Sequence, residues 1–306
     1  MHNEFEKIHR KSVEAMDAIL GKPFRVLDDG FVRVIDYMGS DEAIVQAARV
    51  SYGKGTKKVR EDRNLIRYLM RHRHTSPFEM CEIKLHVRVP MDCWRQWIRH
   101  RTANVNEYST RYSIAIDSAQ KTEPDKWRLQ SSDNRQGSSG FLDPQIGKIM
   151  TQEEERLHNT ARNIYQERLK RGIAREQARK DLPLSTYTEA YWKIDLKNLL
   201  HFLELRMEEH SQLEIRSYAN IIGNEIVRRW CPLTWEAFLD YNMNCIMLSG
   251  NEIHIIRSII SGDKKRAIKI ADELGWLPES KKSVKKDLER VEFETKLKRL
   301  NLSVPW

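Results

Sequence analysis

The chain has 306 residues, of which 40% are hydrophobic and 32% are charged, and its formal net charge is +9 at pH 7. This length and composition suit a globular protein with one large domain, or with a domain and an appendage. The absence of any run of about 18 apolar residues excludes a membrane-spanning helix. The positive charge favours anionic partners, but it does not distinguish nucleic acid from nucleotides or phosphorylated cofactors.

Along the chain, the spacing of apolar residues predicts a series of helices and strands. In order, these are a strand over 31–38, helices over 40–52 and 62–73, a strand over 80–89, a helix from Pro90 to Ile98, an exposed loop over 118–140, a helix over 151–171, a β-forming segment over 186–194, and helices over 195–208 and 214–229. The strand over 80–89 has the most regular alternation, with one apolar face made of Cys81, Ile83, Leu85, Val87 and Val89. Thr151 and Glu154 resemble a capping box, so the long charged helix is expected to begin there.

The order of these elements favours one fold class. Helices and strands do not alternate as βαβ units, and no GxGxxG motif is present, so a dinucleotide-binding Rossmann domain is not supported. Residues 245–306 read as two or three short basic helices punctuated by Gly250, Gly262 and Pro278. We therefore expect an α+β fold with an antiparallel sheet flanked by helices over residues 1–244, and a helical extension over 245–306.

The cysteines and the N-terminus indicate the compartment and the chemistry. Cys81, Cys93, Cys231 and Cys245 are widely spaced and form no CxxC pair, so no metal site is expected. Cys81 and Cys93 lie among apolar residues and are expected to be buried thiols rather than nucleophiles. The N-terminus lacks the apolar segment of a secretory signal, which favours a cytoplasmic location.

Residues 99–112 form the segment with the greatest density of polar chemistry. They include three arginines, one histidine, two asparagines, one glutamate and one serine. Burying so many donors requires matched charges, which points to an anionic ligand or to a solvent-facing basic loop. Trp94 and Trp97 precede the segment and offer it a rigid apolar support, which favours the ligand-binding interpretation over a solvated loop.

This segment resembles the signature of flavin-dependent thymidylate synthases, written RHRxxSxNExSxRY. The matching positions are Arg99, His100, Arg101, Asn106, Glu107, Ser109, Arg111 and Tyr112. Asn104 stands where the pattern has its first serine. Residues 74–79, 179–183 and 205–215 are also similar to family segments, with Ser76 in place of a threonine, and the resemblance extends over about residues 25–240.

The resemblance implies an activity and a set of partners. Family members convert dUMP to dTMP with methylenetetrahydrofolate as carbon donor, a bound FAD, and NADPH as reductant, and they release tetrahydrofolate. They need no cysteine nucleophile, which agrees with the lack of a suitable cysteine in this chain. The family also implies a homotetramer whose active sites combine residues from several subunits.

The resemblance also assigns roles to individual residues. Arg206 is the expected catalytic residue, because an arginine stays cationic and can stabilise a uracil that has lost its N3 proton. The dUMP site maps to Gln96, Arg99, Glu107, Tyr108, Ser109, Thr110, Arg111, Arg179 and Arg206. The FAD contacts map to Ser76, Arg99, His100, Arg101, Glu107, Asp195, Lys197 and His201, with His74 and His210 near the flavin.

Each assignment has a structural alternative. Arg206 could be a surface arginine on an amphipathic helix, and His74 and His210 could be purely structural. Ser109 could be read as a nucleophile, but no base and acid nearby in the sequence support that reading. Lys197 stands where the family often has arginine, so it keeps the charge for a pyrophosphate and loses the bidentate fork.

Two other functions remain as alternatives. One is a basic nucleic-acid-binding module that uses the basic residues of the C-terminal tail, Lys264, Lys265, Arg266, Lys281, Lys282, Lys285 and Lys286. Acidic residues interleave with these lysines and no nucleic-acid-binding fingerprint is present, so this function is disfavoured. The other keeps the flavin and uracil chemistry but yields a different C5-modified pyrimidine nucleotide.

Overall fold

The computed structural model describes residues 11–50, 59–131, 137–277 and 287–306. The chain divides into two compact units, Met1–Met243 and Asn244–Trp306. Among the described residues, no helix is both long and apolar enough to cross a membrane. The predicted end of a helix at Tyr52, and Pro278, lie outside the described residues.

A five-stranded sheet forms the centre of the first unit. Its order is β1-β2-β3-β7-β4, and every pairing between neighbours is antiparallel, which confirms the predicted fold class. The strands are β1 (Phe24–Val26), β2 (Gly30–Met38), β3 (Glu82–Pro90), β4 (Asn104–Glu107) and β7 (Tyr187–Asp195). Leu85 in β3 lies opposite Val34 in β2 and Trp192 in β7, and all three are fully buried on the same face.

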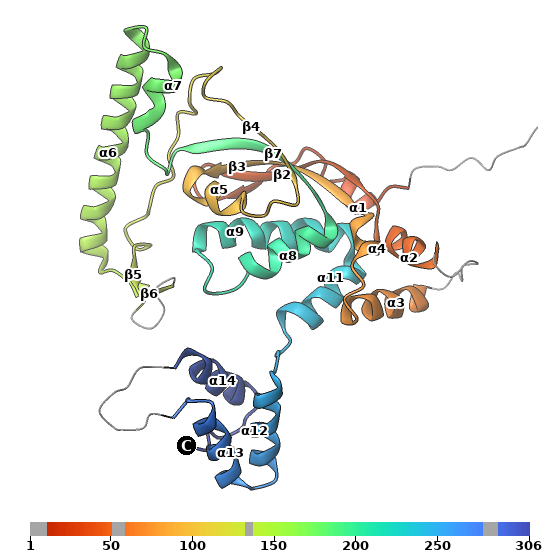
Figure 1. The fold of residues 1–306 in the computed structure, drawn as a ribbon. Coiled ribbons are helices and arrows are strands. Elements are labelled where there is room, and N and C mark those ends of the chain that lie inside the picture. The colour runs from red at the N-terminus through yellow and green to blue at the C-terminus, as the bar shows by residue number, and fades with distance from the viewer. Residues whose placement is uncertain (1–10, 51–58, 132–136, 278–286) are drawn as a thin grey trace, which may run out of the picture. The chain divides into compact units, whose positions relative to one another are not determined.

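Helices cover the apolar face of this sheet. Apart from α6 (Pro144–Lys170) and α7 (Arg175–Ala178), which lie to one side, the α-helices of the first unit are α1 (Glu14–Asp17), α2 (Asp41–Val50), α3 (Val59–Arg71), α4 (Ser76–Glu79), α5 (Met91–Trp97), α8 (Leu196–Arg206), α9 (Leu213–Ile221), α10 (Arg228–Trp230) and α11 (Pro232–Phe238). Figure 1 shows α8 and α9 lying side by side under the sheet. Trp97 at the end of α5 packs between the sheet and α8. Its ring centroid is 5.2 Å from that of Trp192 in β7 and 4.9 Å from that of Phe202 in α8.

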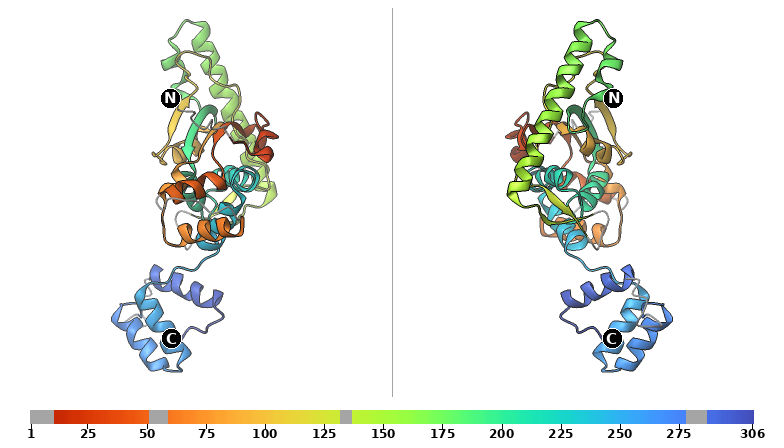
Figure 2. Two further views of the ribbon diagram at one scale, coloured as in Figure 1. Left: turned by 90° about the vertical axis from the view of Figure 1, so that its right-hand side faces the viewer. Right: turned by 90° about the vertical axis from the view of Figure 1, so that its left-hand side faces the viewer.

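The long helix α6 (Pro144–Lys170) begins earlier than predicted. Asp143 caps it by accepting from the backbone N–H groups of Gln145 and Ile146. The predicted start at Thr151 is wrong, because its hydroxyl is buried and accepts a hydrogen bond from the indole of Trp127. A local pattern cannot tell a capping threonine from one that binds a distant tryptophan. In Figure 2, α6 runs along one side of the sheet, and α7 (Arg175–Ala178) follows near its C-terminal end.

Two other expectations are corrected. The predicted loop over 118–140 contains a short hairpin of β5 (Arg128–Gln130) and β6 (Ser138–Phe141). The predicted helix over 214–229 is α9 followed by a π-helical segment, Ile222–Val227, and then α10. Hairpin residues without apolar alternation, and a change of helical pitch, leave no periodic signal in a sequence.

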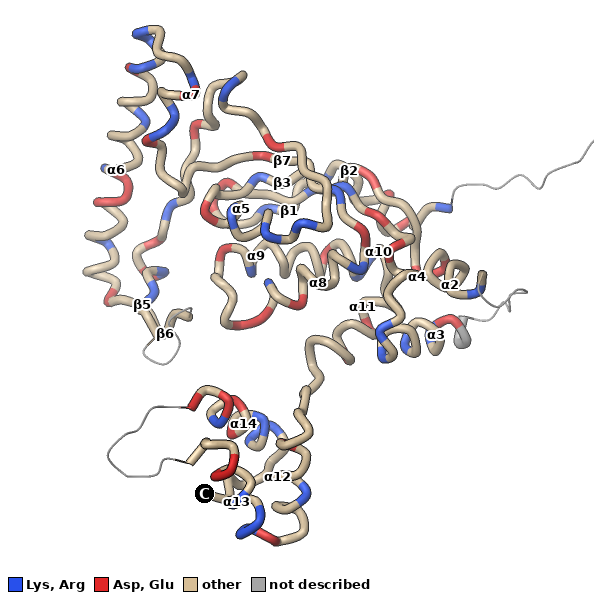
Figure 3. Tube along the Cα trace, viewed as in Figure 1, with Lys and Arg blue, Asp and Glu red and all other residues tan. Residues whose placement is uncertain are grey.

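The second unit has a core of its own. It consists of α12 (Gly250–Ile260), α13 (Lys264–Glu273) and α14 (Leu288–Arg299). The buried hydrophobic residues of this core are Ile255, Ala267, Ala271, Trp276, Phe293 and Leu297. Figure 3 shows both basic and acidic residues on these helices, so charges of both signs share the described surface. Of the tail lysines considered above for nucleic-acid binding, those at 281, 282, 285 and 286 lie outside the described residues.

A buried ion pair connects two helices of this unit. Glu252 is 2% exposed, caps α12 by accepting from the Ser249 backbone N–H, and also accepts from Lys296 Nζ at 2.8 Å. Replacing Lys296 by methionine is expected to destabilise the unit by about 1–3 kcal/mol, because the buried carboxylate loses its charged partner. Hydrogen exchange of the full chain should accelerate in peptides from α12 and α14. The matched control is Lys298→Met on the exposed side of α14; equal exchange in the two variants would show that the ion pair contributes nothing.

Candidate active site

The signature segment does not form one surface in the fold. Residues 99–102 follow α5 and lie against α8, residues 104–107 form the edge strand β4, and residues 109–112 lie beyond it. The side chains of Arg99 and Arg101 are exposed. Within the described part of the chain, neither guanidinium forms an ion pair, so both are available to an anionic ligand.

A pocket of about 350 Å³ brings the first part of the signature together with α8. Its lining residues are Arg99, His100, Arg101, Thr102, Ile194, Asn198, His201, Leu205 and Arg206. Arg206 is half-buried at the end of α8. Its Nε donates to His100 Nε2 at 3.1 Å, and its Nη2 donates to the backbone carbonyl of Gln96 at 3.4 Å. The guanidinium therefore has a defined orientation in the pocket, unlike a surface arginine.

His100 is neutral in this arrangement. Burial, reinforced by the positive charges of Arg206 and His201, lowers the pKa of His100 to about 4. Burial also lowers the pKa of Arg206 from its usual value. A neutral imidazole can accept the Arg206 N–H, whereas an imidazolium cannot.

This hydrogen bond predicts a specific pH dependence. Above the pKa of about 4, His100 holds Arg206 in place, so turnover should not vary with the ionisation of His100 at neutral pH. Turnover should fall as the pH drops through this value, because the protonated ring repels the guanidinium. In His100→Gln, whose amide oxygen accepts without titrating, this acidic fall should be absent. A pH–rate profile that is the same in both proteins would exclude His100 as the titrating group.

A second group of predicted residues gathers around α7. Arg179 donates from Nη1 to the hydroxyl of Thr110, and Arg111 Nε lies 3.3 Å from a carboxylate oxygen of Glu176. Arg175, which sequence reasoning missed, donates to the backbone carbonyl of Tyr112 at 2.6 Å. The structure therefore brings Thr110, Arg111 and Arg179 together, although about seventy positions separate the first and last of them.

The remaining members of the signature have local partners. Ser109 Oγ accepts from the Arg111 backbone N–H at 3.3 Å, and Tyr108 donates its hydroxyl hydrogen to the Ile114 carbonyl at 2.8 Å. A carboxylate oxygen of Glu107 accepts from the Thr188 hydroxyl at 2.9 Å. None of these bonds includes a base that activates Ser109, so its hydroxyl is suited to binding.

Several predicted residues lie elsewhere on the protomer. His74 and Ser76 line a largely apolar pocket of about 570 Å³ next to Tyr68. His210 contacts the carboxylate of Glu208 on the loop after α8, and that contact raises the pKa of His210. The pocket around Arg206 includes neither His74, Ser76 nor His210, so the single chain does not place all the predicted residues around one cavity.

Asp195, Lys197 and His201, which are predicted to contact FAD, lie at the cap of α8 and in its first two turns. Asp195 caps the helix by accepting from the Asn198 backbone and side-chain N–H groups. Lys197 donates to the Asn198 amide oxygen at 3.1 Å. Asn198 itself lines the pocket with His201 and Leu205, and sequence reasoning missed it. The helical spacing of 198, 201 and 205, which places all three on one face, could have found it.

Gln96 and the cysteines are the last of the residues considered in the sequence. Gln96 donates to Gln212, whose amide nitrogen lies 3.2 Å from a carboxylate oxygen of Asp92. Cys81 and Cys93 are fully buried, as predicted. Burial and the nearby carboxylate of Asp92 raise the pKa of the Cys93 thiol, so it stays protonated and is a poor nucleophile.

Comparison with known proteins identifies the family. A family described as "Thymidylate synthase complementing protein" matches residues 33–233. A flavin-dependent thymidylate synthase of Wolbachia pipientis wMel is 51% identical over 258 residues, which cover 84% of this chain and 90% of that protein. The chain belongs to the flavin-dependent thymidylate synthase family. A second such synthase, from Rickettsia bellii (strain RML369-C), is 50% identical over 272 residues, covering 83% and 91% of the two chains.

A solved structure extends the comparison to three dimensions. The UMP/dUMP methylase PolB from Streptomyces cacaoi, bound with 5-Br dUMP, is 32% identical, with a TM-score of 0.64. The match covers 72% of this chain and 98% of that one. All the predicted site residues, from His74 to His210, lie inside the region that matches the family of flavin-dependent thymidylate synthases, and the second compact unit lies beyond it.

Proposed function

We propose that this chain catalyses the reductive methylation of dUMP to dTMP in the cytoplasm. Methylenetetrahydrofolate supplies the carbon, NADPH supplies the reducing equivalents through bound FAD, and tetrahydrofolate is released. The observation that carries the proposal is the pocket in which a neutral His100 orients the half-buried Arg206, in a chain of this family. We assign catalysis to residues 1–244 and assign no role to the extension over 245–306.

The proposed dUMP site combines the pocket with the cluster at α7. It consists of Gln96, Arg99, Glu107, Tyr108, Ser109, Thr110, Arg111, Arg179 and Arg206. Arg111 and Arg179 provide charged, forked donors suited to a phosphate, and Ser109 and Thr110 add hydroxyl groups beside them. Arg206 lies apart from this cluster in the pocket with His100, which suits contact with the uracil ring.

The residues proposed to contact FAD include basic side chains that fit an anionic ligand. They are Ser76, Arg99, His100, Arg101, Glu107, Asp195, Lys197 and His201, with His74 and His210 nearby. The exposed guanidiniums of Arg99 and Arg101 suit a pyrophosphate. FAD, when bound, supplies the hydride chemistry of the reaction.

Arg206 has the electrostatic role in this proposal. Uracil C5 becomes nucleophilic when the ring carries extra electron density, and loss of the N3 proton provides it. A fixed guanidinium in a partly desolvated pocket stabilises that anion more than mobile water does. Because Cys81 and Cys93 are buried and Cys93 stays protonated, the proposed reaction has no covalent cysteine adduct.

We further propose that the active protein is a homotetramer. In one protomer, Ser76 and His74 lie at a different pocket from Arg206, and His210 lies at a third. Different copies of the chain that meet at these pockets would bring all of these residues to one bound FAD. This separation supports active sites at subunit interfaces.

The proposal is tested by spectroscopy and by isotope release. The purified full chain should be yellow, and its flavin absorbance should bleach with NADPH under anaerobic conditions. With folate and reductant present, it should release tritium from dUMP labelled at C5. A colourless protein that binds no added FAD and releases no tritium would overturn the proposed function.

The solved structures make UMP a second substrate to test. PolB is described as a UMP/dUMP methylase, and a structure bound with 5-Br UMP is 33% identical with a TM-score of 0.61. UMP should therefore be assayed beside dUMP with this chain. If UMP is turned over at a comparable kcat/KM, the proposed substrates would be both UMP and dUMP, and the proposed reaction would still be methylation at C5.

A further inference from the structure

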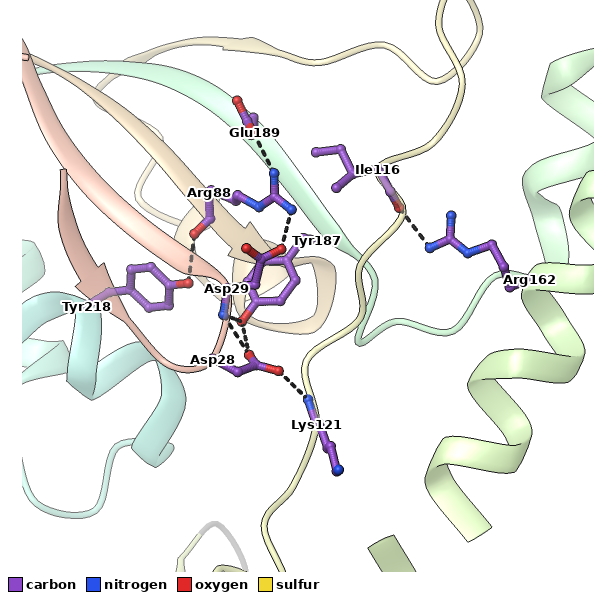
Figure 4. A network of polar contacts seen from close by, with 9 residues as sticks. All are labelled: Asp28, Asp29, Arg88, Ile116, Lys121, Arg162, Tyr187, Glu189 and Tyr218. Atoms are coloured by element: carbon purple, nitrogen blue, oxygen red, sulfur yellow. Dashed lines mark hydrogen bonds and ion pairs between the residues drawn. The ribbon is translucent and has the colours of Figure 1, made fainter. Parts of the chain in front are cut away.

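The segment that carries Ser109, Thr110 and Arg111 continues past β4 as an extended stretch with fixed points. At its far end, the Lys121 backbone N–H donates to Asp28 at 3.0 Å, and Asp28 also accepts from the Tyr187 hydroxyl. Figure 4 shows the stretch from Ile116 to Lys121 passing between the sheet and α6. The segment is therefore held against the protein at positions well beyond the signature itself.

Helix α6 supplies the fixed points closest to the signature. The hydroxyl of Tyr165 accepts from the Ala115 backbone N–H at 2.9 Å, in a fully buried contact. One turn earlier, Arg162 donates to the Ile116 carbonyl at 3.0 Å and pairs with Asp117 at 2.7 Å. Consecutive backbone groups just after the signature are thus satisfied by side chains of one helix.

The same tyrosine also contacts the segment that carries Arg179. Tyr165 is 1% exposed and packs in a small buried cluster with Ala115 and Ala178, next to Leu169 and Leu182. Ala178 directly precedes Arg179, and its carbonyl accepts from Arg168 of α6 at 3.3 Å. Tyr165 therefore contacts the two chain segments whose side chains meet in the hydrogen bond between Arg179 and Thr110.

We propose that Tyr165 is a positioning residue for the phosphate end of the substrate site. Its ring fixes the distance between α7 and the stretch after the signature, and its hydroxyl fixes the direction of that stretch. Side chains on two separate loops can grip one phosphate only if the loops keep a constant spacing. This inference rests on the proposed function, because it takes Thr110, Arg111 and Arg179 to bind the dUMP phosphate.

The test removes the hydroxyl and keeps the ring. In Tyr165→Phe, we expect the KM and Kd for dUMP to rise about fivefold, the effect of one ordinary hydrogen bond, while kcat and the visible flavin spectrum stay unchanged. Binding of deoxyuridine, which lacks the phosphate, should not change. The matched control is Tyr218→Phe, since Tyr218 is also fully buried and donates its hydroxyl hydrogen to the Arg88 carbonyl at 2.7 Å, away from both loops. It should leave dUMP binding unaltered.

A third variant separates this inference from the function on which it rests. Arg179→Ala should weaken dUMP binding more strongly than Tyr165→Phe, and the double variant should show less than the product of the two effects. Weaker dUMP binding in Arg179→Ala with none in Tyr165→Phe would overturn the positioning role alone. Unchanged binding in Arg179→Ala would overturn the proposed phosphate site. Equal loss for dUMP and deoxyuridine in Tyr165→Phe would show a general structural role instead.

Discussion

Replacing Arg206 by alanine is expected to lower dTMP formation by about 10²–10³-fold, the usual effect of removing a fixed donor that stabilises a developing anion. The guanidinium is half-buried, and it is oriented by His100 Nε2 at 3.1 Å and by the Gln96 carbonyl. Among the described residues, no other guanidinium donates a hydrogen bond to His100. The measurement is the single-turnover rate of dTMP formation, together with the flavin content of the purified variant.

The controls distinguish chemistry from folding. Arg206→Lys keeps the charge without the fork, so it should recover only part of the rate. Arg171→Ala removes an arginine on the surface that is 72% exposed and pairs with Glu167, and it should leave the rate unchanged. An Arg206→Ala protein that holds flavin and turns over at the wild-type rate would contradict the proposed catalytic role.

Replacing Trp97 by alanine is expected to lower the free energy of unfolding of the first unit by about 3–5 kcal/mol, the usual cost of truncating a buried tryptophan. Trp97 is fully buried, and its ring contacts Trp94, Trp192, Phe202 and Tyr218. The substitution leaves a cavity at the end of α5. Because Arg99 of the pocket follows α5 directly, this cavity also weakens the packing that supports the pocket. Urea denaturation of the full chain, followed by circular dichroism, measures the loss.

A surface aromatic provides the comparison for this stability prediction. Phe141 is 57% exposed in the hairpin, and Phe141→Ala should change the free energy of unfolding by less than about 0.5 kcal/mol. Trp97→Phe should fall between the two, because a smaller ring leaves a smaller cavity and removes an indole N–H that has no partner in the described part of the chain. Equal stability of the alanine variants at 97 and 141 would show that the aromatic cluster does not support the fold.

Much of the local structure follows from the sequence alone. Alternation over residues 80–89 predicted β3 and its buried face, because the side chains of a strand point to opposite sides in turn. Helical spacing predicted the helix that ends near Arg206, and the signature over 99–112 identified the family. These features depend on residues close together in the chain, so a local pattern is enough to show them.

Only the tertiary structure decided which distant groups meet. His100 and Arg206 are 106 positions apart, and Tyr165 is 50 positions from Ala115, yet each pair forms a hydrogen bond. The Thr151 hydroxyl binds Trp127 and the Thr122 carbonyl rather than capping a helix. Such contacts arise when the sheet and its helices bury their apolar faces together. Residue spacing determined what each segment could form, and packing determined what each side chain could reach.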